Sequence, residues 1–544
     1  MNSPGQRSPA ALVAVILVAG LIGFACSAQA AAPAPLGSAQ FVPSPERPVG
    51  WRGDGSGRYP GATPPLSWAR KKDGSGYAAK NVLWMTPLPQ TSVSTPIIVG
   101  ERIFLTAEVA DLVCLDKQSG RILWIRSNPE FEGVPEAERK ENPAYAEKLL
   151  ALLPQMAQAN ADAITALNAS AGDTIPISRT AGNRVMSPAV VAALAKKREL
   201  EKQIYDAQRA IDKKKFERYW GQGVFGFSGQ TPVSDGAHVC AFFTTGVTAC
   251  YSLDGTRKWI ALGRGGGSEH GNFASPLLCA GRLVVWANEL RGYEVQSGKL
   301  LWSVPETGQN TYGSLFGLAS GNELIAASQS GYFVRLSDGK PIWGERVFGD
   351  AIMTPIIAGG AIFAAVGYPR NNNESLGFRA FKIPAATESA KLVPAYTFKT
   401  EWSDDEIPAD KQKAPFNRGY VASPLLVEGL IYRMTQGAGL IVNDAATGEL
   451  VYRKVLPLKP RTQYWDWAGA AASPTLAGKH IYLMDNQGAT VVIEPGKQYK
   501  EVGLNVLEES KDGKSQAQNL ASPVFEGTRM YYRTPGFLYC IGEK

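Results

Sequence analysis

The chain has 544 residues, a length that corresponds to several domains or to one large repetitive domain. Hydrophobic residues make up 44% and charged residues 19%, values that exclude a disordered chain. The net charge of +7 is spread along the sequence without a long basic run, so we expect no nucleic-acid partner. Three histidines leave little material for a zinc site or a histidine-based catalytic triad.

The first 30 residues are typical of an export signal. Arg7 is the lone charge, residues 10–24 form an apolar run, and Ala-Gln-Ala at 28–30 is a small-x-small cleavage site. The run is shorter than the ~20 residues that a membrane helix needs. We therefore expect cleavage after Ala30 and a periplasmic or extracellular mature chain without a transmembrane segment. The alternatives are an uncleaved anchor and lipid attachment at Cys26, whose preceding residues match a lipid-attachment signal poorly.

One pattern recurs along the rest of the chain: a small residue, usually Ser or Thr before Pro, then two apolar stretches joined by a Gly turn. Its copies start at Ser94, Gln230, Ala274, Gly313, Met353, Ala422, Ala472 and Ala521. Most copies are followed by an Asp-containing turn with Gly and a stretch that ends at an aromatic residue. These aromatic residues are Trp124, Trp259, Trp302, Trp343 and Tyr452. We interpret each signature as a β-hairpin whose aromatic residue packs between neighbouring sheets.

The repeat predicts the architecture. Four short strands per ~40–45 residues are typical of a propeller blade. Eight copies therefore predict an all-β, eight-bladed β-propeller with four-stranded blades. The last copy supplies three strands, and the strand VLWMTPL from Val82 fits as the missing fourth, which closes the ring. The alternatives are an open solenoid and a seven-bladed ring, because the copy at Gly313 lacks the Pro.

The spacing of the copies is interrupted by residues 128–219, which are rich in Ala, Lys, Glu and Leu at helical spacing. We interpret this segment as an α-helical hairpin inserted between blades 1 and 2, with its second helix at 188–218. The predicted domains are a signal peptide at 1–30, an N-terminal lead-in at 31–78, a propeller strand and blade 1 at 79–127, the helical insertion at 128–219, and blades 2–8 at 220–544.

In the second helix, the apolar residues Leu194, Ile204, Ala207 and Ile211 lie near one face, and the remainder is mostly charged. Such a narrow apolar stripe holds one partner helix and little more. We expect the hairpin to project from the ring and contact another protein. The alternative is a lid that lies flat over the propeller.

Two further features leave alternatives open. Cys240 and Cys250 lie five residues either side of Thr245 in a predicted hairpin. We expect two small core residues there, with a disulfide as the alternative. The acidic loop at 401–411 is expected to be solvated, with a calcium site as the alternative.

In a propeller, the loops that enter the innermost strands open on one end of the central channel. Here these loops precede the repeated Ser or Thr, and their polar and aromatic side chains form a candidate ligand site. The candidate residues are Trp220, Gln222, Glu269, His270, Asn272, Tyr312, Asp350, Asn417, Arg418, Trp465, Asp466 and Asn519. The alternative is that the loops only close the channel by hydrogen bonds and stacking. No catalytic residue and no metal site is predicted.

The Asp-x-x-x-Gly-x-x-x-Trp hairpins, as in LDKQSGRILW from Leu115, resemble the PQQ-type propeller repeat of quinoprotein alcohol dehydrogenases and BamB-type outer-membrane assembly factors. The segments WRGDGSGRYPG from Trp51 and NVLWMTPLP from Asn81 resemble those of exported PQQ-like repeat proteins. The resemblance implies the propeller fold, whereas function depends on the site.

Quinoprotein dehydrogenases of this fold carry adjacent cysteines over the cofactor, a catalytic Asp and ligands to calcium. This sequence contains no Cys-Cys pair and no Cys-x-x-Cys-His haem motif. We therefore expect an exported cell-envelope binding or scaffold protein with no cofactor, whose partner is another envelope protein bound through the helical insertion or a propeller face. The alternative is a PQQ-dependent periplasmic dehydrogenase that holds PQQ with calcium.

Overall fold

The computed structural model describes residues 1, 33–73, 76–171, 178–180, 183–185, 187–218, 226–267, 272–308, 311–349, 351–367, 377–399, 421–460, 469–508 and 519–544. The chain divides into Met1–Pro33 and Ala34–Lys544, and the fold below is that of the second unit. The predicted signal peptide with Cys26 and the acidic loop at 401–411 lie outside the described residues. None of the described helices is long and apolar enough to cross a membrane.

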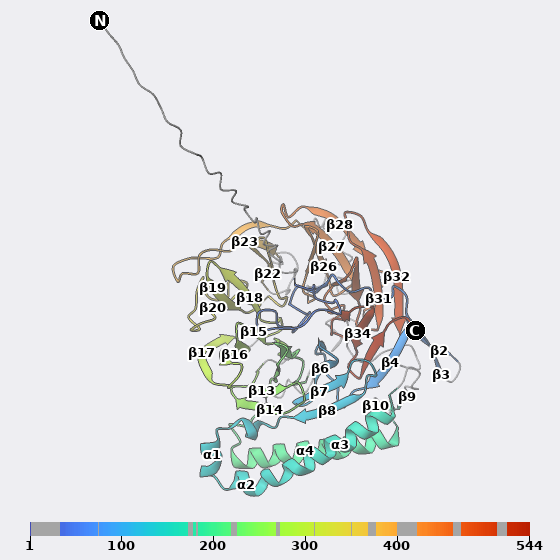
Figure 1. The fold of residues 1–544 in the computed structure, drawn as a ribbon, viewed down its shortest axis with the longest axis vertical. Helices are drawn as coiled ribbons and strands as arrows, with labels where there is room; N and C mark the ends of the chain where they lie inside the picture. Colours follow the sequence, from blue (N-terminus) through green and yellow to red (C-terminus); the bar gives the residue numbers. More distant parts are fainter. Residues whose placement is uncertain are drawn as a thin grey trace, which may run out of the picture. The chain divides into compact units, whose positions relative to one another are not determined.

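Sheets of antiparallel strands follow one another along the chain and lie around a common centre (Figure 1). The first sheet contains β5 (Ile97–Val99), β6 (Arg102–Ala107), β7 (Asp111–Asp116) and β8 (Ile122–Ser127). The second contains β11 (Val233–Ser234), β12 (His238–Phe242), β13 (Val247–Ser252) and β14 (Arg257–Leu262). The third contains β15 (Leu277–Cys279), β16 (Arg282–Glu294) and β17 (Leu300–Gly308), and the fourth β18 (Phe316–Ser320), β19 (Glu323–Ala327) and β20 (Phe333–Arg335).

The later copies of the repeat form sheets in the same way. The fifth contains β21 (Ile356–Ala358), β22 (Ala361–Val366), β23 (Gly377–Lys382) and β24 (Pro394–Thr397). The sixth contains β25 (Leu425–Val427), β26 (Leu430–Met434), β27 (Gly439–Asp444) and β28 (Leu450–Val455). The seventh is built on β29 (Thr475–Ala477), β30 (His480–Met484), β31 (Ala489–Glu494) and β32 (Lys500–Leu507), and the eighth on β33 (Val524–Glu526), β34 (Arg529–Arg533) and β35 (Phe537–Ile541).

The N-terminal strands join the last two sheets. In the seventh sheet, β1 (Arg58–Tyr59) pairs parallel with β29, β2 (Ala69–Asp73) pairs parallel with β32, and β3 (Gly76–Lys80) pairs with β2. In the eighth sheet, β4 (Val82–Pro87) pairs antiparallel with β35 and becomes its fourth strand. The pairing brings the two ends of the repeat array into one sheet.

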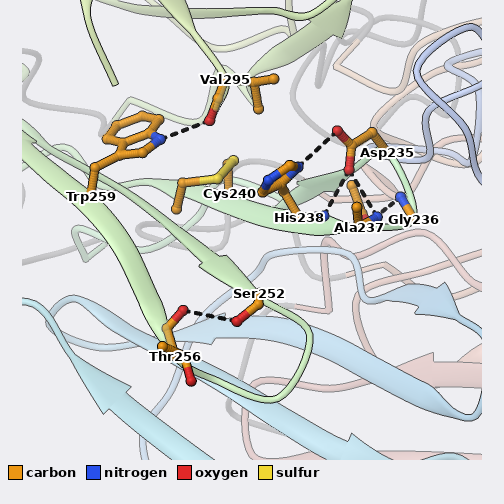
Figure 2. The surroundings of a disulfide bond; sticks show 11 residues. Asp235, Gly236, Ala237, His238, Cys240, Ser252, Thr256, Trp259 and Val295 are labelled. Carbon is orange, nitrogen blue, oxygen red and sulfur yellow. Dashed lines mark hydrogen bonds and ion pairs between the residues drawn. A yellow bond between two sulfur atoms is a disulfide. The ribbon is translucent and has the colours of Figure 1, made fainter. Parts of the chain in front are cut away.

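The aromatic residues of the repeated hairpins pack between neighbouring sheets, as the sequence predicts. The indole N–H of Trp259 donates to the carbonyl of Val295 at 2.7 Å, and that of Trp302 donates to Leu336 at 3.0 Å, in each case in the next sheet (Figure 2 shows the first bond). The turn glycine of the next hairpin makes this possible. Gly298 has a φ of +72°, and a Cβ there would lie 2.4 Å from the ring of Trp259.

The insert between the first two sheets is helical. It contains the short 3₁₀ helices η1 (Glu130–Gly133) and η2 (Leu150–Leu152), the helices α1 (Glu136–Glu141), α2 (Ala144–Lys148), α3 (Leu153–Ala169) and α4 (Pro188–Ile211), and a small hairpin of β9 (Ser178–Thr180) and β10 (Asn183–Val185). Ser187 caps α4 by accepting the N–H of Val190, and Pro188 takes the first helical position. The predicted second helix is therefore confirmed, but it ends at Ile211.

The expectation of a projecting arm is wrong. The helices α3 and α4 lie along the outer strands of the first two sheets (Figure 1), and residues such as Ala163, Leu167 and Val190 share one apolar core with β8. The side chain of Asn168 accepts the N–H of Ile122 at 2.8 Å and donates to its carbonyl at 2.9 Å, so it pairs with the exposed edge of β8. The helices also do not form a flat lid over the propeller.

The expectation of two unlinked cysteines is also wrong. Cys240 and Cys250 form a disulfide, with their Cα atoms 4.1 Å apart (Figure 2). The two residues are directly opposite each other in β12 and β13, so the hairpin itself brings the sulfur atoms together. Both side chains are fully buried, in an apolar cluster formed by the second and third sheets.

Candidate functional site

The repeated Ser or Thr residues form a closed circle of hydrogen bonds at the start of the innermost strands. In each case the backbone N–H of one residue donates to the hydroxyl oxygen of the equivalent residue in the next repeat, at 2.8–3.4 Å. We call this set the hydroxyl circle. Its members, in order of donation, are Thr95, Thr231, Ser275, Ser314, Thr354, Ser423, Ser473 and Ser522, which donates back to Thr95.

The hydroxyl circle gives the repeated motif a physical reason. A buried peptide N–H without a partner is costly, and a hydroxyl one position before Pro supplies an acceptor from the neighbouring repeat. Pro at the next position has no N–H to satisfy and favours an extended conformation before it. The degenerate copy at Gly313 takes part through Ser314, although Leu315 stands where the other copies have Pro.

A cavity of about 120 Å³ lies at this circle. Seven of the eight hydroxyl residues line it, Thr354 being the exception. The residues two positions earlier in each repeat line it as well, and we call them the apolar circle. They are Val93, Gly229, Phe273, Tyr312, Ile352, Val421, Ala471 and Leu520. The cavity therefore has one hydroxyl layer and one mainly apolar layer, each built by the repeat.

The lead-in crosses the centre on the side of the prolines. Val49 pairs with Ser234 of the second sheet, and Trp51 lines the cavity. Next to it, the guanidinium of Arg52 donates to the carbonyl of Pro424 at 3.0 Å and to that of Pro474 at 2.5 Å. Burial lowers the pKa of Arg52 to about 10. The lead-in thus links the second, sixth and seventh sheets beneath the cavity.

Three of the predicted site residues lie in the described part of the chain. Tyr312 lines the cavity. Asn272 is buried, donates from its amide to the hydroxyl of Thr311 at 2.6 Å, and accepts a hydrogen bond from Gln230 on its backbone carbonyl. Asn519 is buried with no hydrogen-bond partner for Oδ1 among the described residues. Outside the described residues lie Trp220, Gln222, Glu269, His270, Asp350, Asn417, Arg418, Trp465 and Asp466.

The sequence contained the signal for the cavity wall. The predicted site residues lie in the loops before each Ser or Thr, whereas the repeat contributes to the wall the Ser or Thr itself and the residue two positions earlier; Tyr312 belongs to both sets. Strict repetition of this pair of positions in eight copies marks two layers around one axis. Ligand binding by the twelve candidate residues stays a prediction.

A known protein family matches the part of the chain that contains most copies of the repeat. The family model described as outer membrane protein assembly factor BamB matches residues 76–195 and 287–522, more than half of the chain. The chain belongs to this family. It is a PQQ-like β-propeller protein, as the sequence resemblance implies. No curated protein sequence matches it.

Solved structures similar to this BamB-family chain have low sequence identity. BamB from Moraxella catarrhalis is 12% identical with a TM-score of 0.40, over 57% of this chain and 81% of its own. The quinohemoprotein alcohol dehydrogenase from Comamonas testosteroni is 11% identical with a TM-score of 0.46, over 85% of this chain and 76% of its own.

The described wall of the cavity offers no charged partner to the carboxylates of PQQ. PQQ is a planar molecule with three carboxylates, and an ionised carboxylate placed in a buried site needs a charged or hydrogen-bonded partner. The described residues that line the cavity include no charged side chain. The disulfide of Cys240 and Cys250 is not part of this wall. Among the described residues, no group of three or more His, Cys, Asp or Glu side chains is placed to hold a metal ion.

Proposed function

We propose that the chain is an exported cell-envelope protein that binds another envelope protein and works without PQQ. Its eight sheets are the blades of one ring, which β4 closes. The pairing of β4 with β35 and the eight-membered hydroxyl circle support this ring. The matching family is described as an outer-membrane assembly factor. Of that role, we propose for this chain only the binding of another protein at the cell envelope.

The helical insert is the observation that carries the proposal. A connection between blades needs a few residues, and this one uses about 90. A buried ion pair fixes the insert to the first sheet, with Lys197 Nζ 2.8 Å from the Asp111 carboxylate. The opposite side of α4 stays exposed and charged, and the side chains of Lys196 and Lys202 are 58% and 68% exposed. A rigid charged surface of this kind suits a protein partner.

Charge reversal tests this surface. We would compare the wild-type mature chain, K196E/K202E on the insert, and K399E/K500E, whose positions lie just after β24 and on β32. Lys399 and Lys500 are 58% and 65% exposed, so the two double variants are matched in exposure and in charge change. Each tagged chain is crosslinked in an envelope fraction of the source organism, and its captured proteins are quantified by mass spectrometry.

We expect a partner that the wild type and K399E/K500E capture and that K196E/K202E captures about tenfold less. Loss of the partner from K399E/K500E alone would assign binding to a propeller face and contradict a role of the insert. The same set of proteins on all three chains and on an untagged control would contradict the proposed function.

A further inference from the structure

The hydroxyl circle leaves a set of buried hydrogen-bond donors. Its seven cavity-lining members are each at least nine-tenths buried. Each hydroxyl accepts one backbone N–H, and none of the seven donates its own proton to an acceptor among the described residues. Thr354, the member outside the wall, does donate, to the carbonyl of Ser314 at 3.3 Å. The unused hydroxyls therefore gather at the cavity.

Hydroxyl groups both donate and accept, so they pair best with a partner that does the same. The rest of the wall is apolar or aromatic, with the rings of Trp51, Phe273 and Tyr312 at the cavity. The described wall includes no charged side chain that would offset the cost of burying an ion. The chemistry of the wall thus favours a neutral ligand with many hydroxyl groups on one side and C–H groups on another.

The volume sets the size of this ligand. One ordered water occupies roughly 10–15 Å³ of cavity volume. A cavity of about 120 Å³ therefore has room for about ten atoms of the size of a water oxygen, that is, about ten non-hydrogen ligand atoms. A pyranose or a cyclitol has this size, and its ring carries hydroxyl groups at the edge and C–H groups on the face.

We propose that the central cavity binds a neutral cyclic polyol of monosaccharide size. The ligand hydroxyls exchange hydrogen bonds with the hydroxyl circle, and its C–H face packs on the aromatic members of the wall. This binding is independent of a protein partner on the insert, so either proposal can fail without the other.

Two matched substitutions test the site. T231V and T354V are close in shape to the parent residue, and each removes one acceptor from the hydroxyl circle. Of these two residues, Thr231 lines the cavity and Thr354 does not. Binding of D-glucose and of myo-inositol to the full mature chain is measured by isothermal titration calorimetry, with succinate as a charged probe of similar size. Thermal unfolding of each variant reports folding.

We expect at least one of the two polyols to bind the wild type with a Kd below about 50 mM. Its Kd for T231V should be at least about fivefold higher. T354V should keep the affinity within about twofold while losing similar thermal stability. If T231V fails to fold, A471L, which adds volume to the apolar circle without removing a hydroxyl, should abolish binding. No polyol binding, equal weakening by T231V and T354V, or tighter binding of succinate than of either polyol would overturn the proposal.

Discussion

Glu108 follows β6 directly, and the carboxylate of this half-buried residue accepts hydrogen bonds from two consecutive residues. The N–H groups of Phe227 and Ser228 lie 2.8 Å and 2.9 Å from Oε1, and the hydroxyl of Ser228 lies 2.5 Å from it. Burial raises the pKa of Glu108 to about 7, although these hydrogen bonds and the charge of Arg218 act in the opposite direction. The folded chain therefore holds this proton more tightly than the unfolded chain does.

This pKa gives a pH prediction for Glu108→Gln. The folded pKa of about 7 exceeds the ordinary value of 4.5, so the stabilising contribution of protonated Glu108 is complete below pH 4.5 and is lost as the pH rises through 7. Between these values, the free energy of unfolding of E108Q should rise relative to the wild type by roughly 3 kcal/mol. Urea unfolding across this pH range measures the difference. The exposed control E46Q should show no such trend, and a flat E108Q difference would contradict the prediction.

At the scale of elements, α4 shows how a charged residue holds a helix to a sheet. Lys197 is fully buried, lies 2.8 Å from the Asp111 carboxylate of β7 and pairs with Glu201 one turn along the helix. Burial lowers the pKa of Lys197, but the two carboxylates overcome this effect and raise it to about 12. Lys197 therefore stays charged in the folded chain, and its contact with Asp111 fixes the position of the insert.

Replacing Lys197 by Met should destabilise the chain strongly. The substitution keeps most of the side-chain volume but leaves Asp111 buried without a cation, which costs about 3–5 kcal/mol. The control Lys196→Met removes an exposed pair with Asp162 and should change the free energy of unfolding by less than about 1 kcal/mol. Urea unfolding followed by circular dichroism compares the two. Similar stability of both variants would mean that the insert is not held by this ion pair.

The helices of the insert could be predicted from the sequence, but their packing against the propeller could not. The helical composition predicts α3 and α4 correctly, because intrinsic propensity is local. The buried side of α4 runs through Val190, Leu194, Lys197, Ile204 and Gln208 at helical spacing. Lys197 and Gln208 are polar, so the apolar stripe in the sequence is narrower than the helix face that is buried in the structure. Their partners, Asp111 and Glu130, come from distant positions that carry no local mark.

For the whole molecule, the repeat makes the succession of sheets predictable. Most copies contain the same short sequence signals. They are a turn glycine, an aromatic residue at the end of the hairpin, and a Ser or Thr that usually precedes Pro. The strands β1–β3 are not predictable in this way, because β1 and β2 pair with strands near the other end of the chain. Of the predicted site residues in the described part of the chain, Tyr312 lies in the cavity wall, whereas Asn272 and Asn519 each come one position before a wall residue. A loop residue and a residue at the junction of loop and strand look alike in sequence.

A substitution in β4 tests whether the array behaves as one closed unit. Met85 is fully buried and lies opposite Tyr539 of β35. Met85→Asp should cost more than about 4 kcal/mol, because it buries a carboxylate without a partner. Circular dichroism and tryptophan fluorescence should then report one lowered transition, whereas the exposed control K80D should melt like the wild type. An unchanged main transition would show that β4 is dispensable for the ring.

The central claim is that this PQQ-like propeller binds a partner and does not use PQQ. The most direct measurement is a titration of the mature chain with PQQ in the presence of calcium, followed by quinone absorbance and by dye-linked alcohol oxidation. We predict no saturable change in absorbance and no alcohol-dependent dye reduction above a protein-free control. Saturable binding accompanied by alcohol oxidation would contradict the account and establish a quinoprotein dehydrogenase.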